Sequence, residues 1–254
     1  MQREEFERQL WLDYIHTHPD LGGLGLLPLD AKPDYLALLT LNHGPFSTAR
    51  LTRTLKRMGY ACATQYALAD KGLLIHLLGA PNSSWLVLVE LQPAALRTTP
   101  RNALIELVEE SHPRDCKGHN LLCRGRPWPM PSWQLYQQLL AEHPLAAWLA
   151  AMGPRLHHAG FNCQTLGEPI AALNEAFERK GMQCTKDQEN GLFPVSSMLE
   201  HRFYHALPQK MVFRQGDEHR LCLGGLALAQ KIPGQGASTL CEALLPAHTR
   251  CEMA

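Results

Sequence analysis

The sequence lacks the features that mark several large classes of protein. Its 24 basic residues are balanced by 24 acidic ones, so no polyanion-binding surface is indicated and we expect no nucleic-acid partner. No run approaches the roughly 18 apolar residues that a membrane span needs, and we expect no membrane association. The opening segment MQREEFERQL carries charges where a signal peptide needs an apolar run. We therefore expect a soluble, cytoplasmic protein.

Familiar chemical motifs are also missing. The eight cysteines contain no Cys-x-x-Cys pair, which argues against a disulfide scaffold or a redox motif. There is no Gly-rich phosphate loop, nucleophile elbow or His-Glu-x-x-His helix. One segment, HPRDCKGHNLLC, has residue types that ligate zinc, at an unusual spacing: His112, Cys116, His119 and Cys123. The role of this Cys/His cluster stays open at this stage.

What is present is a repeated order of apolar segments. PDYLALLTL predicts a buried strand, and a helix ending near Gly59 and two further strands follow it. In the second half, RLHHAGFNC predicts a strand that is again followed by a helix, ending near Gly181, and by more strands. The first helix ends in KRMGY (56–60) and the second in ERKGM (178–182). The separation of these two segments matches that of the strands that precede the helices. This pattern predicts an internal duplication of a βαββ-type unit.

The 254 residues are therefore interpreted as a single domain made of two pseudo-repeat halves. A proline-rich connector with helical segments separates the halves, and the last residues have weak periodicity, so they either wrap the surface or are disordered. The expected parts are a first module at about 33–97, a helical connector at 98–152, a second module at 153–231 and a tail at 232–254.

Two adjacent histidines in the strand PRLHHAGFNC are the first candidate site residues. Successive side chains of a regular strand point to opposite faces, so we predict that His157 and His158 do not enter the same cavity. His157 shares its face with apolar neighbours and is predicted to pack in the core. His158 shares its face with Gly160, which leaves room for a ligand, so His158 is the better cavity candidate.

From about Pro33 to Lys231, the order of the strands and their sequences resemble those of the 2-oxoadipate dioxygenase/decarboxylase family, also called hydroxyglutarate synthase. PDYLALLT is similar to the Asp-His-x-Ala-x-Arg-Thr strand of that family, and AAWLAAMGPRLHHAGFNC is similar to the run into its Asn-His strand. ALAQK resembles the closing Glu-Phe-Ala-x-Arg. The resemblance implies an α+β fold of the vicinal-oxygen-chelate type, in which duplicated βαβββ-type modules form a curved sheet around a central cavity, with additional helices.

The resemblance also implies a chemistry. Members of the family hold non-haem Fe(II), or at least a divalent metal, through two histidines and a glutamate. One side of the metal stays open for a 2-oxo acid and O₂. The reaction decarboxylates and hydroxylates the acid to a 2-hydroxy acid, in lysine catabolism. A small 2-oxo acid or a related carboxylate is therefore the expected partner.

Residue by residue, most of that metal site is replaced. The resemblance places its first histidine on Tyr35, its second on His158 and its glutamate on Ala227, while the arginine that meets the substrate carboxylate falls on Leu39. Alanine cannot ligate a metal, and leucine cannot provide the paired hydrogen bonds of a guanidinium. Tyrosine ligates only as a phenolate, which requires a large fall in its pKa.

Other side chains that can ligate a metal lie near these positions in the sequence or in the predicted sheet, and they could replace the missing ligands. The metal is then expected on His158, with partners among Tyr35, His76, Glu90, Glu200 and His201. Two hypotheses follow. The chain is a divergent dioxygenase/decarboxylase with a degraded or rewired metal site, or it is a non-catalytic binding or regulatory module that retains the fold.

Overall fold

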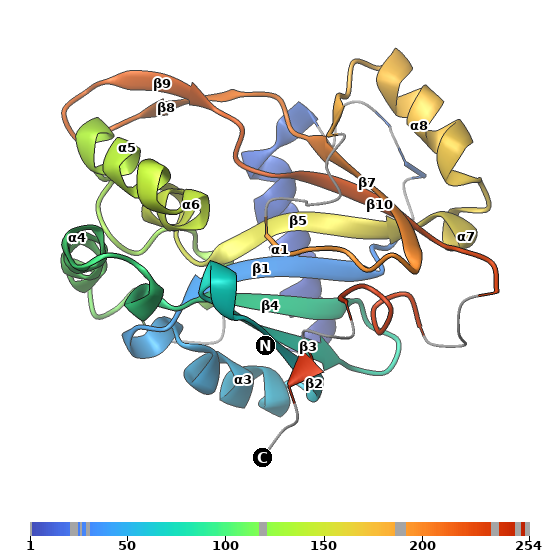
Figure 1. The fold of residues 1–254 in the computed structure, drawn as a ribbon, viewed down its shortest axis with the longest axis horizontal. Coiled ribbons are helices and arrows are strands. Elements are labelled where there is room, and N and C mark those ends of the chain that lie inside the picture. Colours follow the sequence, from blue (N-terminus) through green and yellow to red (C-terminus); the bar gives the residue numbers. More distant parts are fainter. Residues whose placement is uncertain are drawn as a thin grey trace.

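The computed structural model describes residues 2–20, 25, 27–28, 31–116, 121–185, 192–234, 239–246 and 250–251. Within this described part, a large curved sheet dominates the structure, with strand order β11-β2-β3-β4-β1-β5-β10-β7-β6 (Figure 1). The edge strand β11 is the short segment Arg250–Cys251. A separate hairpin pairs β8 (Gln209–Val212) with β9 (Glu218–Leu221).

Each half of the sheet has the same topology. The first half runs through β1 (Tyr35–Leu41), α3 (Thr48–Arg57), β2 (Ala61–Leu68), β3 (Leu73–Gly79) and β4 (Trp85–Leu91). The second runs through β5 (Arg155–Asn162), α7 (Cys163–Leu166), α8 (Ile170–Arg179), β6 (Cys184–Thr185), β7 (Leu199–His205) and β10 (Gly225–Lys231). In each half the first strand pairs in parallel with the last one, and the remaining pairs are antiparallel. This arrangement confirms the predicted α+β fold with duplicated βαβββ-type modules.

The two halves meet at the centre of the sheet, where β1 and β5 pair antiparallel. All seven residues of β1 are buried, which explains why its sequence is apolar at nearly every position and lacks alternation. Tyr35 stands opposite Gly160 in this pairing. Gly160 in turn stands opposite Ala227 of β10, so these three positions form one row across the centre of the sheet.

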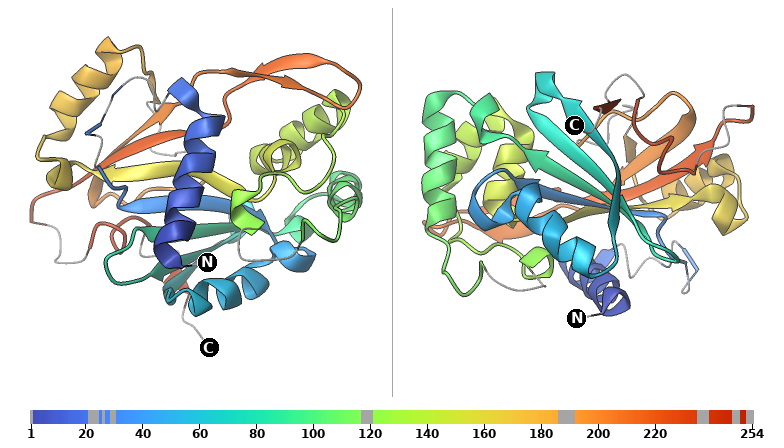
Figure 2. Two further views of the ribbon diagram at one scale, coloured as in Figure 1. Left: turned by 180° about the vertical axis from the view of Figure 1, so that it is seen from behind. Right: turned by 90° about the horizontal axis from the view of Figure 1, so that it is seen from below.

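Helices cover the sheet face that lies opposite the Tyr35 side chain. The helix α1 (Arg3–Thr17) crosses the sheet there, with Trp11 against Phe161 at a ring-centroid distance of 6.1 Å (Figure 2). In the second half, Phe177 of α8 packs on Tyr204 of β7. The connector helices lie beside one end of the sheet: α4 (Thr98–Glu109), α5 (Trp133–Glu142) and α6 (Pro144–Met152). Within the described residues, no helix is long and apolar enough to cross a membrane.

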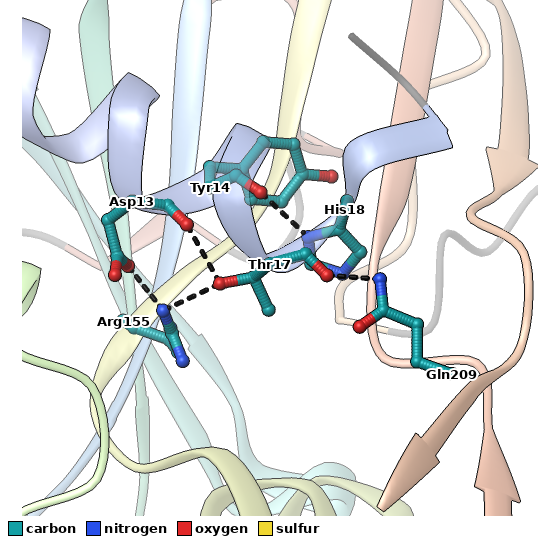
Figure 3. A network of polar contacts seen from close by, with 6 residues as sticks. All are labelled: Asp13, Tyr14, Thr17, His18, Arg155 and Gln209. Carbon is teal, nitrogen blue, oxygen red and sulfur yellow. Dashed lines mark hydrogen bonds and ion pairs between the residues drawn. The ribbon is translucent and has the colours of Figure 1, made fainter. Parts of the chain in front are cut away.

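The C-terminal end of α1 is fixed to the start of β5 by a polar network (Figure 3). The Arg155 guanidinium pairs with Asp13 at 2.5 Å and also donates to the Thr17 hydroxyl at 2.9 Å. The Gln209 amide donates to the Thr17 carbonyl. Because this ion pair is mostly shielded from water, it holds α1 in register with the strand that carries the two histidines.

The short C-terminal segment 239–246 contributes to the core. Leu240, Cys241 and residues 243–245 are all buried, and the Leu244 carbonyl accepts a hydrogen bond from the Ser196 amide at 2.8 Å. The Cys241 thiol lies 3.8 Å from the Asp34 carbonyl, next to the start of β1. This part of the expected tail therefore packs against the rest of the protein through buried apolar side chains. Its apolar residues cover the Tyr35 side of the sheet without any helical or strand periodicity that would reveal this in the sequence.

Candidate functional site

The centre of the sheet holds a tyrosine between two histidines, on the face opposite α1. The Tyr35 hydroxyl lies 3.3 Å from Nε2 of His158 and 3.2 Å from Nε2 of His201. Tyr35 begins β1, His158 lies on β5 and His201 on β7. Tyr35 and His158 are fully buried, and His201 is partly exposed. The structure thus brings together three of the side chains that the sequence proposes as site residues.

The position of the Tyr35 ring depends on Gly160. A Cβ atom at Gly160 would lie 1.9 Å from Cε1 of the ring, so only glycine lets the ring lie across β5. Asp34 holds the two strands together at this point. Its amide donates to the Gly160 carbonyl at 2.8 Å, and its carboxylate accepts from the Asn162 amide at 3.0 Å.

Gly160→Ala is expected to destabilise the protein by about 1–3 kcal/mol, because the added methyl group overlaps a buried ring that cannot move freely. Urea unfolding of the variant measures this loss. In Tyr35→Leu, which removes the ring edge, the same glycine substitution is expected to cost markedly less. Equal costs in the two backgrounds would show that Gly160 is not there to make room for Tyr35.

His157 does not point away from His158, and the alternation prediction is wrong at this point. The β1–β5 register shifts between Ala37, which pairs with His158, and Leu38, which pairs with Leu156. His157 is therefore an extra residue in a β-bulge, and a bulge allows neighbouring side chains to lie on the same side of a strand. As a result, Nδ1 of His157 lies 3.0 Å from Nδ1 of His158, and both rings contact Phe203.

These contacts form a continuous hydrogen-bonded chain in the order His157, His158, Tyr35, His201. A neutral imidazole has one donor and one acceptor nitrogen, and a phenol donates once and accepts. All three hydrogen bonds can form if each group donates to the next one along the chain. The order of donation can run from His157 to His201 or from His201 to His157. We call these four side chains the relay; they satisfy one another without any net charge.

Burial strongly disfavours charge on the relay. Desolvation lowers the pKa of His157 to about 3 and that of His201 to about 4, and it lowers the pKa of His158 well below its ordinary value. The neighbouring histidines lower the His158 pKa further, because a second positive charge there would be repelled. Desolvation also raises the pKa of Tyr35 far above its ordinary value. The relay is therefore neutral at physiological pH.

A pocket of about 320 Å³ connects the relay to solvent at His201. It lies between β7 and the segment that precedes it. Its described lining consists of Val195, Ser196, Ser197, Leu199, Glu200, His201 and Ile232. The volume lies at the lower end of the range for small-molecule sites.

Three other predicted donors do not join Tyr35 and His158. Glu90 pairs with Thr40 of β1, so it lies on the opposite face from Tyr35, and it accepts hydrogen bonds from the Thr48 amide and the Gln92 side chain, each at 2.8 Å. It thereby stabilises the start of α3, where a negative charge is favourable. His76 lies on the same face as Glu90, with Nδ1 4.0 Å from the Cys62 thiol. Glu200 is exposed and pairs with Arg202 at 2.9 Å.

The donor set does not fit the two-histidine, one-carboxylate centre that the resemblance implies. Ala227 lies in the same row as Tyr35 and Gly160, and it supplies no ligand. Leu39 follows Tyr35 on the same face of β1 and is fully buried, so no guanidinium is present there. No group of three or more His, Cys, Asp or Glu side chains in the described residues is arranged to hold a metal. The phenol of Tyr35, whose pKa is raised by burial, is unsuited to replace the carboxylate.

Of the Cys/His cluster at 112–123, His119 lies outside the described residues. Of its other members, Cys123 is more deeply buried, and desolvation raises the pKa of its thiol to about 12. Burial also raises the pKa of Cys116. In the absence of a metal, both thiols are therefore neutral.

The fold of the described residues is of the vicinal-oxygen-chelate type, and the solved structures similar to it include a hydroxyglutarate synthase and a presumed glyoxalase-superfamily protein. Solved structures with this architecture cover most of the chain, at sequence identities that show the fold alone. A presumed hydrolase from Shewanella frigidimarina has a TM-score of 0.80 and 22% identity, and the alignment covers 91% of this chain and 93% of that one.

The hydroxyglutarate synthase of Oryza sativa, solved in complex with 2-oxoadipate, has a TM-score of 0.76 and 16% identity over 98% of this chain and 87% of that one. A presumed glyoxalase-superfamily protein from Ralstonia eutropha has a TM-score of 0.63 and 17% identity, over 80% and 73% of the two chains. No family model matches the sequence, and a search of curated proteins finds no significant match.

Proposed function

We propose that this chain is a binding module that retains the fold of the hydroxyglutarate synthases but works without the metal centre of that family. The observation that carries the proposal is the place of the Tyr35 hydroxyl, between Nε2 of His158 and Nε2 of His201. These are the nitrogen atoms that a metal on this face would need. The phenol satisfies both of them. Ala227, which stands where the resemblance places the glutamate ligand, contributes no carboxylate.

The expected ligand is a small carboxylic acid, such as a 2-oxo acid, bound in the pocket beside His201. Support comes from the size of the pocket and from the Ser196, Ser197 and His201 side chains that line it, because hydroxyl and imidazole groups hydrogen-bond carboxylates. The negative charge of Glu200 at the rim is offset by Arg202. The complex of the Oryza sativa protein with 2-oxoadipate supports the ligand class.

The test is a thermal-shift and calorimetric screen with 2-oxoadipate and shorter 2-oxo acids, run with EDTA and again with added Fe(II) and O₂. We expect binding that EDTA does not change, and no O₂ consumption. His201→Ala is expected to weaken binding at least about tenfold, since a buried hydrogen bond to a charged group is worth about 1.5–3 kcal/mol. His16→Ala, which removes an exposed histidine on α1, is the matched control and should bind normally.

Absence of binding by the folded protein across the acid panel would refute the ligand proposal. Iron-dependent O₂ consumption with release of CO₂ would instead support the divergent-enzyme hypothesis. One observation favours that second hypothesis: ligands in a tetrahedron about 2.0 Å from a metal are about 3.3 Å apart, which is close to the spacing of the Tyr35 oxygen from the two nitrogens. The metal measurements in the Discussion separate the two hypotheses.

A further inference from the structure

A second cavity lies in the first half of the protein. It is formed between α3 and two residues that follow α4, Cys116 and Leu121. Its volume is about 600 Å³, which is enough for a nucleotide-sized molecule. Its described lining consists of Gly44, Pro45, Arg50, Leu51, Arg53, Thr54, Arg57, Cys116 and Leu121. None of these residues belongs to the relay or to the pocket beside His201.

Three arginines dominate the chemistry of this cavity. Arg50, Arg53 and Arg57 follow the i, i+3, i+7 spacing of one helix face, so all three side chains of α3 reach the same space. A rise of about 1.5 Å per residue spreads their Cα atoms over about 10 Å along the helix axis. No acidic residue is among the described lining residues.

Among the residues that the structure describes, no carboxylate neutralises the charges of these arginines. All three side chains are exposed, and no hydrogen bond or ion pair links any of them to another described residue. A cavity near the start of β5 provides a contrast. Four basic residues line it, and three of them have carboxylate partners: Arg124 is paired with Asp115, Arg155 with Asp13 and Lys210 with Glu218. The fourth, Arg126, donates hydrogen bonds to the carbonyls of Trp128 and Ala151. Arginines placed together at the surface repel one another, so an arrangement without partners favours the binding of an anion.

The remaining lining indicates what kind of anion. Leu51 and Leu121, both mostly buried, and Pro45 provide an apolar surface beside the row of guanidinium groups. Guanidinium groups bind phosphate oxygens through paired hydrogen bonds, and a row of three suits several adjacent phosphates better than one. An apolar surface next to such a row suits the organic part of the same ligand.

We propose that this cavity binds a small organic molecule that carries a di- or triphosphate group, with Arg50, Arg53 and Arg57 holding the phosphates. The proposal is independent of the function proposed for the relay, because the two sites share no residue. Thr54, one turn from Arg50 and Arg57 on the same helix face, offers a hydroxyl donor to the same oxygen atoms.

The test is isothermal titration calorimetry of the full chain with inorganic tripolyphosphate, pyrophosphate and orthophosphate at low ionic strength. We expect tripolyphosphate to bind at least about tenfold more tightly than orthophosphate, with an affinity that falls as salt is added. The triple variant Arg50→Gln/Arg53→Gln/Arg57→Gln is expected to lose this binding. The matched control Lys32→Gln/Arg179→Gln/Arg220→Gln removes the same total charge from exposed positions outside the cavity and should keep it.

Because the three arginines are exposed, the triple variant should fold normally, which a thermal melt verifies. Equal weakening in the two triple variants would show that only net charge matters and would overturn the proposal. So would an affinity for tripolyphosphate no greater than that for orthophosphate. A nucleoside triphosphate that binds more tightly than tripolyphosphate would support the role of the apolar surface.

Discussion

If the chain works without a metal centre, as proposed, the double variant Tyr35→His/Ala227→Glu is expected to gain a divalent-metal site. The substitutions place an imidazole and a carboxylate on β1 and β10, on either side of the β5 strand that already carries His158. Removing the phenol also frees Nε2 of His158, so two histidines and one carboxylate become available on neighbouring strands. We expect affinity for Zn(II), Mn(II) or anaerobic Fe(II) to rise at least about 100-fold over the parent, as measured by calorimetry.

The stability of this variant provides a second readout. Without metal, the new glutamate is an unpaired charge at a fully buried position, so the melting temperature should fall below that of the parent. Added metal should restore it, because ligand bound only to the folded state stabilises that state. The matched control Tyr35→His/Ala227→Gln has the same shape without the carboxylate. Its buried amide should also lower the melting temperature, but added metal should not restore it. A variant that folds with metal present yet binds none would contradict the assignment of these strand positions to one site.

The second large effect expected is a steep loss of stability as the pH falls below about 6.5. The folded-state pKa values of His157, His158 and His201 are lowered by burial, so the unfolded chain takes up protons that the folded protein does not. Stability is therefore complete above the unfolded pKa of about 6.5 and decreases toward the folded values. For His157, whose pKa is lowered to about 3, the loss is about 2 kcal/mol at pH 5, and the lowered pKa values of His158 and His201 add to the loss in the same direction.

Urea unfolding at pH 7.5, 6 and 5 measures this dependence. His158→Gln keeps a polar partner for Tyr35 but cannot be protonated, so its stability should vary less steeply with pH than that of the parent. His16→Gln, at an exposed position, should keep the full slope. Identical slopes in all three proteins would mean that the relay histidines do not remain neutral in the folded state.

The sequence allowed the architecture to be predicted, because each element of the repeated unit leaves a local pattern. The buried run of β1 and the glycines that end α3 and α8 are visible without knowing what packs against them. The equivalent order of strands in the two halves then follows from the offset between KRMGY and ERKGM, and the structure confirms this fold class.

The site was harder to predict because it depends on how strands pair. The bulge at His157 is a mismatch between β5 and β1, and neither strand reveals it alone. Glu90 and Tyr35 lie on opposite faces only because of the register between β4 and β1. His201 could be proposed as a donor from the sequence, but its contact with Tyr35 spans 166 positions along the chain. Cys241, whose burial beside Tyr35 raises the pKa of its thiol, gave no signal in an aperiodic tail.

The place of the Tyr35 hydroxyl between two histidines is tested most directly by loading the unmodified protein with metal. The purified chain is incubated with excess Zn(II) or anaerobic Fe(II), dialysed and measured by elemental mass spectrometry, with His158→Gln in parallel. We predict far less than one metal ion per chain and no difference between the two proteins, because the phenol already satisfies both nitrogens. One ion per chain in the parent, lost in His158→Gln, would contradict this prediction and show that Tyr35, His158 and His201 form a rewired metal centre.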